Sequence, residues 1–262
     1  MSGDPVLFER DGAVATIRLN RPDRLNAIDE EAAQLLLDAV RRASREDGLR
    51  ALVLRGEGRA FMAGGDVTTF HSAGDGVTKL VRKVIGKLEE TVSVLDRLRV
   101  PVVARVQGAV AGAGMSLMCA ADVVVAAEDT RIAFAYHAIG TTPDGGLSWT
   151  LPRLVGLRRA TEIAFLGEPI GAEEALRLGL VTRVVPLEEL DRATSEVAQR
   201  LASGPTLAFG RARELFRRTF DFTLPEQLAL ERESFLASTR TEDFREGVAA
   251  FVERRRADFH GR

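Results

Sequence analysis

Short apolar runs in the first two thirds of the chain predict a series of buried strands. Two of these runs, Val6–Glu9 and Val14–Leu19, flank Asp11-Gly12, a dipeptide that readily takes the positive φ angles of a hairpin turn. We therefore expect the chain to begin with a β-hairpin. Further strands are predicted at Ala51–Leu54, Val102–Val106, Val123–Ala126 and Val181–Val185.

Helical periodicity alternates with these runs. Behind Asp29, a residue type suited to an N-cap, the apolar residues Leu36, Val40 and Ala43 recur at helical spacing. Because strands that alternate with helices need crossover connections, the pattern indicates a largely parallel sheet and an α/β fold. A second helical stripe consists of Val81, Ile85, Leu88, Val92 and Leu95.

The last quarter of the chain changes character, because only helical patterns follow Pro186. We expect this helical end to pack on the core or on a neighbouring subunit. The predicted helices are Leu187–Ala202, Thr206–Arg217, Pro225–Phe235 and Asp243–Arg256.

Charge and cysteine content narrow the possible functions. Lys and Arg total 36 against 38 Asp and Glu, and this net charge of -2 gives no strong field for nucleic acid or anionic membranes. One cysteine, Cys119, and three scattered histidines offer no disulfide framework and no metal-ligand spacing. The first ten residues lack the apolar core of a signal peptide, and no stretch suits a membrane span. We therefore expect a cytoplasmic protein without a metal.

Two small-residue loops carry the first sign of chemistry. Gly58–Asp66 and Gly108–Ser116 each follow a buried strand. Read alone, the first loop is more readily a tight strand-to-helix turn, and the small residues of the second are also explained by a helix that packs closely on a sheet. Together they can converge at one edge of the sheet and present two backbone N–H groups to one carbonyl oxygen. Such an oxyanion hole contributes on the order of 3 kcal/mol per donor to lowering a reaction barrier.

The chain resembles the crotonase (enoyl-CoA hydratase/isomerase) superfamily over nearly its whole length. The similarity follows the family's order of motifs, which is far more specific than a single glycine loop. The matching segments are Asn20–Ile28, Ala60–Asp66, Pro101–Gly114, Ile139–Gly146, Leu151–Gly156, Ala172–Val181 and Phe244–Arg255.

This resemblance implies a spiral of ββα units, with residues 1–195 as the core and residues 196–262 as a C-terminal helical trimerisation region. It also implies an acyl-coenzyme A substrate, with coenzyme A entering as part of the thioester rather than as a separate cofactor, and a homotrimer or a dimer of trimers. The implied oxyanion donors are the amides of Gly65 and Ala113. Alanine departs from the family's usual glycine at the second position, but its amide remains a donor.

By the same resemblance, the coenzyme A path follows a defined set of residues. Phe251 and Arg254 match residues that reach a neighbouring subunit's nucleotide in the family's trimers, although they could equally be a helix core residue and a solvated charge. The path residues are Arg24, Leu25, Ala27, Ala63, Gly64, Gly65, Asp66 and Ala113.

The acid–base residues depart from the hydratase pattern. Hydratases of the family use two glutamates, but the matching positions here hold Ser116 and Tyr136. Asp144, in Pro143–Gly146, occupies a slot that carries an acidic residue in enoyl-CoA isomerases, ring-epoxide isomerases and aryl-CoA dehalogenases. A single carboxylate is enough to move a proton between two carbons. We therefore expect an isomerase in which Asp144 transfers the proton, and Tyr136 either hydrogen-bonds to the substrate or Asp144 or simply packs.

Other functions remain open from the sequence. Tyr136–Gly140 resembles a dehalogenase stretch, but Glu89 stands where that branch has a histidine, and His137 is as readily a packed or exposed residue as a pocket residue. The alternatives to an isomerase are an atypical hydratase or hydrolase and an RNA-binding relative of the family. Variable residues form the acyl pocket, and they include Phe70, Leu80, Val84 and Trp149, together with Ser116 and Tyr136.

Overall fold

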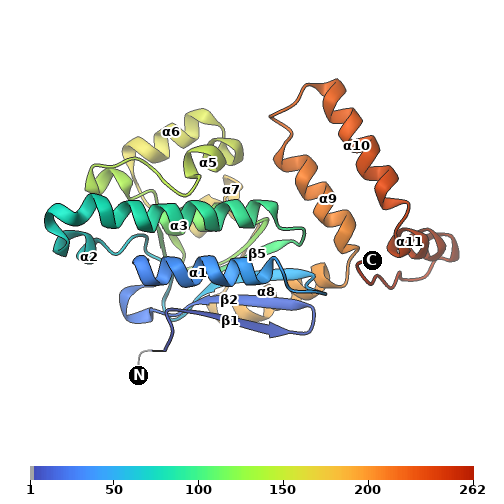
Figure 1. Ribbon diagram of the computed structural model, residues 1–262, viewed down its shortest axis with the longest axis horizontal. Coiled ribbons are helices and arrows are strands. Elements are labelled where there is room, and N and C mark those ends of the chain that lie inside the picture. Colours follow the sequence, from blue (N-terminus) through green and yellow to red (C-terminus); the bar gives the residue numbers. More distant parts are fainter. Residues whose placement is uncertain (1–2) are drawn as a thin grey trace.

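The computed structural model describes residues 3–262 and confirms an α/β core followed by helices (Figure 1). Four short 3-10 turns are η1 (Pro22–Arg24), η2 (Gly74–Gly76), η3 (Tyr136–Ile139) and η4 (Leu187–Glu189). The strands are β1 (Val6–Asp11), β2 (Val14–Leu19), β3 (Ala51–Gly56), β4 (Ala60–Met62), β5 (Val102–Val106), β6 (Ala109–Ala111), β7 (Val123–Ala127), β8 (Arg131–Ala133), β9 (Ile170–Gly171) and β10 (Arg183–Val185). The helices are α1 (Glu30–Ala43), α2 (Val67–Ser72), α3 (Val77–Arg97), α4 (Ala113–Cys119), α5 (Leu147–Val155), α6 (Leu157–Leu166), α7 (Ala172–Arg177), α8 (Leu190–Ala202), α9 (Thr206–Arg217), α10 (Leu224–Ser238) and α11 (Glu242–Glu253).

Two sheets build the core. The larger one has the order β1-β2-β3-β5-β7-β10, and only its β1–β2 pair is antiparallel. This pair is the predicted hairpin, and Gly12 takes a φ of 56° at its turn. A smaller sheet has the order β4-β6-β8-β9. Since β3, β5 and β7 are each followed by a short strand of the second sheet, the chain repeats a strand–strand–helix unit, as the resemblance implied.

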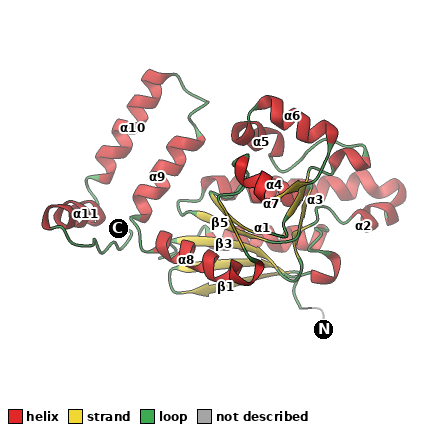
Figure 2. Ribbon diagram, turned by 180° about the vertical axis from the view of Figure 1, so that it is seen from behind, coloured by secondary structure: helices red, strands yellow, loops and turns green. Residues whose placement is uncertain are grey.

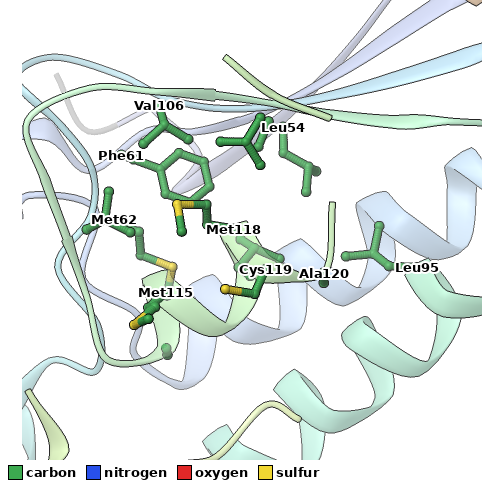
Figure 3. Close-up of a cluster of buried hydrophobic side chains, with 14 of the residues drawn as sticks. Leu54, Phe61, Met62, Leu95, Val106, Met115, Met118, Cys119 and Ala120 are labelled. Atoms are coloured by element: carbon green, nitrogen blue, oxygen red, sulfur yellow. The ribbon is translucent and has the colours of Figure 1, made fainter. Parts of the chain in front are cut away.

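The main hydrophobic core lies between the large sheet and helices α1, α3 and α4. Asp29 caps α1 by accepting a hydrogen bond from the Ala32 amide, as its position predicted. All seven residues of α4 are buried. Figure 3 shows its sulfur-containing side chains gathered with Phe61 and Met62 in one cluster. The site loop that precedes α4 is therefore fixed from behind by tightly packed apolar atoms.

Helix α3 corrects one sequence prediction. Its fully buried stripe is Val84, Leu88, Thr91 and Leu95, whereas Val81 and Ile85 are only partly buried and lie on its flank. Thr91 tolerates burial because its hydroxyl donates to the Lys87 carbonyl at 2.8 Å, which satisfies the polar atom within the helix. A hydrophobicity pattern alone cannot foresee this arrangement.

The C-terminal helices divide into two groups. Helix α8 packs on the opposite face of the large sheet, where Leu190, Ala193 and Ala198 meet Val103 and Val125 in a second apolar cluster. The predicted boundary between residues 195 and 196 lies within this helix. By contrast, α9, α10 and α11 extend away from the core (Figure 1, Figure 2). Within residues 3–262, none of the helices combines the length and apolarity that crossing a bilayer requires.

Arg213 fastens α9 to the core. Its side chain is 7% exposed, and its Nε donates to both carboxylate oxygens of Asp122 at 2.8 and 2.7 Å. Its remaining nitrogens donate to the carbonyls of Leu95, Asp96 and Leu98 at 2.6 to 2.9 Å. The Leu98 N–H reaches only the Leu95 carbonyl, at 3.3 Å. The Arg213 guanidinium therefore supplies the donors that the other carbonyls at the end of α3 need, and it joins two parts of the chain.

Replacing this anchor should destabilise the fold. We expect Arg213→Met to lower the free energy of unfolding by about 2–4 kcal/mol, because buried carbonyls and the Asp122 carboxylate lose their partner. Urea unfolding followed by circular dichroism would measure the loss. Arg192→Ala, which removes exposed ion pairs with Glu189 and Glu196, is the matched control and should leave the midpoint unchanged. An equal effect of the two substitutions would contradict the anchoring role.

Candidate active site

The two small-residue loops meet in space, as their sequence positions predicted. One lies between β4 and α2, and the other between β6 and α4. A Cβ atom added to Gly64 would lie 3.0 Å from the Ala111 carbonyl oxygen and 3.7 Å from the Ala113 nitrogen. Gly64 and Gly112 also take positive φ angles of 95° and 51°. The backbones therefore touch at a point where side chains would separate them.

The amides of Gly65 and Ala113 are uncommitted. Neither donates a hydrogen bond to any acceptor within residues 3–262. The neighbouring groups are engaged, because Ile28 N–H donates to the Gly64 carbonyl at 2.8 Å and Asp66 N–H to the Ile28 carbonyl at 2.9 Å. Two amides without an acceptor among the described residues therefore lie beside the contact between the loops, and their role as oxyanion donors stays a prediction.

Close packing explains why alanine is accepted at position 113. A Cβ on the next residue, Gly114, would lie 2.1 Å from the Met62 carbonyl oxygen, which no side chain tolerates. Glycine is required at 114, where α4 presses on β4, and not at 113. At Gly65, an added Cβ would meet the Phe70 ring at 2.8 Å, so this aromatic side chain lies directly against the first donor.

Asp144 lies beside the donor loops. It precedes Gly145 and Gly146, whose φ angles of 54° and 77° bend the chain into α5. A Cβ on Gly145 would lie 2.9 Å from the Ser116 Cβ and 3.1 Å from a Leu88 methyl, so the Asp144 loop presses on α4 and α3. A Cβ on Gly112 would in turn lie 3.9 Å from the Tyr136 ring. The acid and the two donors therefore share one neighbourhood.

Ser116 and Tyr136 are joined to Asp144 by hydrogen bonds. The Tyr136 hydroxyl donates to Asp144 Oδ1 at 2.6 Å, and Ser116 Oγ lies 3.0 Å from both the Tyr136 hydroxyl and the Asp144 carbonyl oxygen. Tyr136 is 6% exposed and Ser116 is fully buried. Of the alternatives left open for Tyr136, the structure supports a hydrogen bond to Asp144.

The electrostatic setting favours the protonated form of Asp144. Burial raises the pKa of its carboxyl group, the Tyr136 hydrogen bond opposes this, and the Glu89 carboxylate raises the pKa further. Burial and the Asp144 charge raise the pKa of Tyr136, so its hydroxyl remains a donor at neutral pH. The sequence marks Glu89 only as the residue at the position of a dehalogenase histidine, and it gives no sign that Glu89 influences Asp144.

Several residues predicted to line the coenzyme A path lie next to the two amides. Ala63 N–H donates to the Leu25 carbonyl at 3.0 Å, and Ile28 pairs with Gly65. Ala27 lies one residue from that pairing and gives its carbonyl to Arg21 Nη1 at 2.5 Å. The Arg24 side chain is exposed and forms no ion pair within the described chain.

Other predicted residues lie elsewhere or are used within the protein. Asp66 is 4% exposed, caps α2 through the Thr69 amide and pairs with Arg21 at 3.2 Å, so its carboxylate holds the loop. Phe251 and Arg254 lie on and after α11, away from the core, and Phe251 is 86% exposed.

Trp149 and His137, two further residues predicted from the sequence, both lie at least partly exposed at the surface. The Trp149 ring is half-exposed under the Arg153 guanidinium, and its pocket role stays a prediction. His137 is exposed and lies against Gly167, where an added Cβ would meet the imidazole at 2.1 Å. It therefore packs on the end of α6.

Within residues 3–262, no group of three or more His, Cys, Asp or Glu side chains is arranged to hold a metal ion.

Comparisons with known proteins agree with this architecture. Residues 9–262 match the family model described as enoyl-CoA hydratase/isomerase. The chain is 39% identical to a probable enoyl-CoA hydratase of Rhodobacter capsulatus, with both chains covered fully. It is 35% identical to the 1,2-epoxyphenylacetyl-CoA isomerase of Escherichia coli over 98% of each chain. A crystal structure of a putative enoyl-CoA hydratase/isomerase from Mycobacterium abscessus superposes with a TM-score of 0.94 at 33% identity, covering 98% of this chain and 100% of that one.

The packing of α4 on β4 gives a test of the loop geometry. We expect Gly114→Ala to lower the free energy of unfolding by about 1–3 kcal/mol, because its Cβ must displace the Met62 carbonyl. Ala113→Gly, one residue away, should cost less than about 1 kcal/mol, since it adds no atom and keeps the amide. Thermal unfolding of both variants measures the difference. A Gly114→Ala protein as stable as the parent would show that the contact is not limiting.

Proposed function

The chain belongs to the enoyl-CoA hydratase/isomerase family, and within it we propose that the protein is an acyl-CoA isomerase. It would move a double bond, or rearrange a ring epoxide, in a substrate bound through its thioester. The observation that carries this proposal is the lone carboxylate of Asp144 beside two uncommitted amides, with hydroxyl groups at the positions where hydratases of the family have glutamates.

The proposed reaction needs one base and one oxyanion site. The Gly65 and Ala113 amides would bind the thioester oxygen, whose negative charge grows as the α-proton leaves. Asp144 would accept that proton and return it to another carbon, which moves the double bond without adding or removing an atom. A carboxyl group with a raised pKa suits both steps, because it must take up a proton and then release it.

The binding of coenzyme A follows from the same loops. Leu25, Ala27 and Ala63 would line the path, and the unpaired Arg24 guanidinium would meet a phosphate of the nucleotide. Phe70 on Gly65, with Leu80, Val84 and Trp149, would bound the acyl group. Burial raises the pKa of Cys119 to about 12, which leaves its thiol unreactive and suits the reducing cytoplasm that we propose.

We further propose that the C-terminal helices form a homotrimer or a dimer of trimers. Helix α10 has no buried residue, although Leu224, Leu228 and Phe235 are each more than half exposed. Phe216 and Phe220, which precede it, are exposed as well. A monomer rarely leaves so much apolar area uncovered, and a neighbouring subunit would cover it. In that arrangement, Phe251 and Arg254 would approach the neighbour's nucleotide.

A second candidate function is hydration by an unusual pair of carboxylates. The charge of Glu89 on α3 raises the pKa of Asp144, and this electrostatic coupling favours the second candidate, in which Glu89 would serve as the other acid. Incubation with a 2-enoyl-CoA in ¹⁸O-labelled water separates the two functions. An isomerase leaves no label in the acyl chain, whereas a hydratase yields a labelled 3-hydroxyacyl-CoA.

Asp144→Asn is the most direct test of the isomerase. We expect a 10²- to 10⁴-fold loss of α-proton exchange and double-bond migration across a panel of acyl-CoA thioesters, because asparagine cannot carry the proton. Coenzyme A binding, measured by calorimetry, should be preserved, since asparagine can still accept the Tyr136 hydrogen bond.

Asp75→Asn, in η2, is the matched control and should behave like the parent protein. Unchanged turnover in Asp144→Asn would refute the assigned role.

The raised pKa of Asp144 predicts a particular pH dependence. Only the ionised carboxylate can accept the α-proton, so kcat/KM should fall as the pH drops through its pKa. Because burial and Glu89 raise that pKa, the fall should occur at a higher pH than for an ordinary aspartate. A pH profile of kcat/KM measures it. Full activity down to the usual aspartate range would contradict the buried setting.

A further inference from the structure

Around Asp144 there are more oxygen–oxygen contacts at hydrogen-bond distance than hydroxyl hydrogen atoms to fill them. Three oxygen–oxygen contacts join Ser116, Tyr136 and Asp144, at 2.6, 3.0 and 3.0 Å. The two hydroxyl groups supply one hydrogen atom each, and an ionised carboxylate supplies none. One contact must therefore lack a hydrogen atom, and the geometry decides which one.

The shortest contact takes the Tyr136 hydrogen atom. A distance of 2.6 Å between Tyr136 and Asp144 Oδ1 is the length of a charge-assisted O–H···O⁻ bond, whereas the neutral contacts are longer. The Ser116 hydrogen atom then has two acceptors at equal distance, the Tyr136 oxygen and the Asp144 carbonyl oxygen.

The second acceptor already has a donor. The Leu147 N–H donates to the Asp144 carbonyl oxygen at 3.1 Å. If Ser116 also donated there, its oxygen and the Tyr136 oxygen would face each other at 3.0 Å without a hydrogen atom between them. Donation from Ser116 to Tyr136 avoids this repulsion. It also gives a chain in which each hydroxyl polarises the next, from Ser116 through Tyr136 to Asp144 Oδ1.

We propose that Tyr136 and Ser116 are positioning residues whose hydroxyl chain occupies Oδ1 of Asp144 and leaves Oδ2 as the oxygen that carries the substrate proton. This inference rests on the proposed isomerase. In the reaction, the α-C–H bond breaks, its proton bonds to Oδ2, and the electron pair passes to the thioester oxygen. The same proton then returns to another carbon, and the chain at Oδ1 gains and loses no atom.

The surroundings of Asp144 make this chain necessary. Burial and the negative charge of Glu89, an exposed residue of α3, both disfavour the charged form. The hydrogen bond from the Tyr136 hydroxyl of η3 favours the charged form, as does a hydrogen bond from the backbone of Asp144 itself, and Ser116 of α4 is the neutral donor behind Tyr136. Without the chain, the base would be protonated over more of the pH range.

Packing reserves the place of Ser116. Ser116, which carries the first hydroxyl of the hydrogen-bonded chain, is fully buried, and a Cβ on Gly145 would come within 2.9 Å of the Ser116 Cβ. A longer side chain at 116 would push the Asp144 loop away. A small residue with one hydroxyl is therefore the group that both fits beneath the loop and donates to Tyr136.

Three variants test the hydroxyl chain: Tyr136→Phe, Ser116→Ala and the double variant. One readout is the pH profile of α-proton exchange. The other is the infrared carbonyl band of protonated Asp144, assigned by its absence in Asp144→Asn, which needs no substrate. We expect Tyr136→Phe to move both midpoints to higher pH, with a loss of exchange on the order of tenfold below the parent midpoint and little loss on the plateau. Ser116→Ala should move them less in the same direction, and should add nothing in the Tyr136→Phe background.

Thr150→Val is the matched control. Thr150 is a buried threonine of α5 whose hydroxyl donates to the Gly146 carbonyl at 3.2 Å, close to Asp144 but outside the chain. It should leave both midpoints in place. Unmoved or lowered midpoints in Tyr136→Phe, additive effects in the double variant, or an equal shift in Thr150→Val would each overturn the proposal.

The two readouts separate this proposal from the proposed function. Infrared midpoints that move as expected, in a protein that exchanges no α-proton, would support the chain and refute the isomerase. Exchange that depends on Asp144, with midpoints that the variants leave in place, would support the isomerase and refute the chain.

Discussion

Two loops touch through their backbones at Gly64 and Gly112, and the site depends on that contact. It is enforced from behind, because Gly114 brings α4 against the Met62 carbonyl so closely that no Cβ fits between them. The helix in turn is buried over its full length among Phe61, Met62 and the sheet. Core packing therefore sets the position of two main-chain amides, which have no side-chain freedom of their own.

Buried side-chain amides extend this constraint to the loop between β3 and β4. Asn26 Nδ2 donates to the carbonyls of Glu57, Ala60 and Phe61, and Gln107 Nε2 to those of Gly56, Gly58 and Ala60. The hydrogen bonds to the Gly56, Ala60 and Phe61 carbonyls are buried, where a carbonyl without a donor would be costly. Gln107 Oε1 is buried without a hydrogen-bond partner among the described residues, while its Nε2 holds the loop.

The sequence predicted what depends on local pattern and missed what depends on packing between distant segments. The hairpin at Gly12, the N-cap at Asp29 and the C-terminal helices follow from turn chemistry and periodicity, and the structure confirms them. Hydrophobic periodicity predicted the buried stripe of α3 partly on the wrong residues. The polar Thr91 can face the core because its hydroxyl donates to the Lys87 carbonyl. The effect of Glu89 on Asp144 joins residues 55 positions apart, and no spacing rule reports it.

The network around Asp144 bears on which chemistry the site suits. A second carboxylate in hydrogen-bond contact would add like-charge repulsion to a group that burial already pushes toward protonation. Hydroxyl groups carry no charge and can stabilise the carboxylate without that repulsion. They also lack the acidity to deliver a separate proton, since the pKa of Tyr136 is raised by its surroundings. A base supported in this way can take one proton and return it, whereas adding water across a double bond needs a second group to activate the water. In the proposed isomerase, serine and tyrosine at the positions of two glutamates would therefore favour reactions that rearrange the substrate over those that hydrate it.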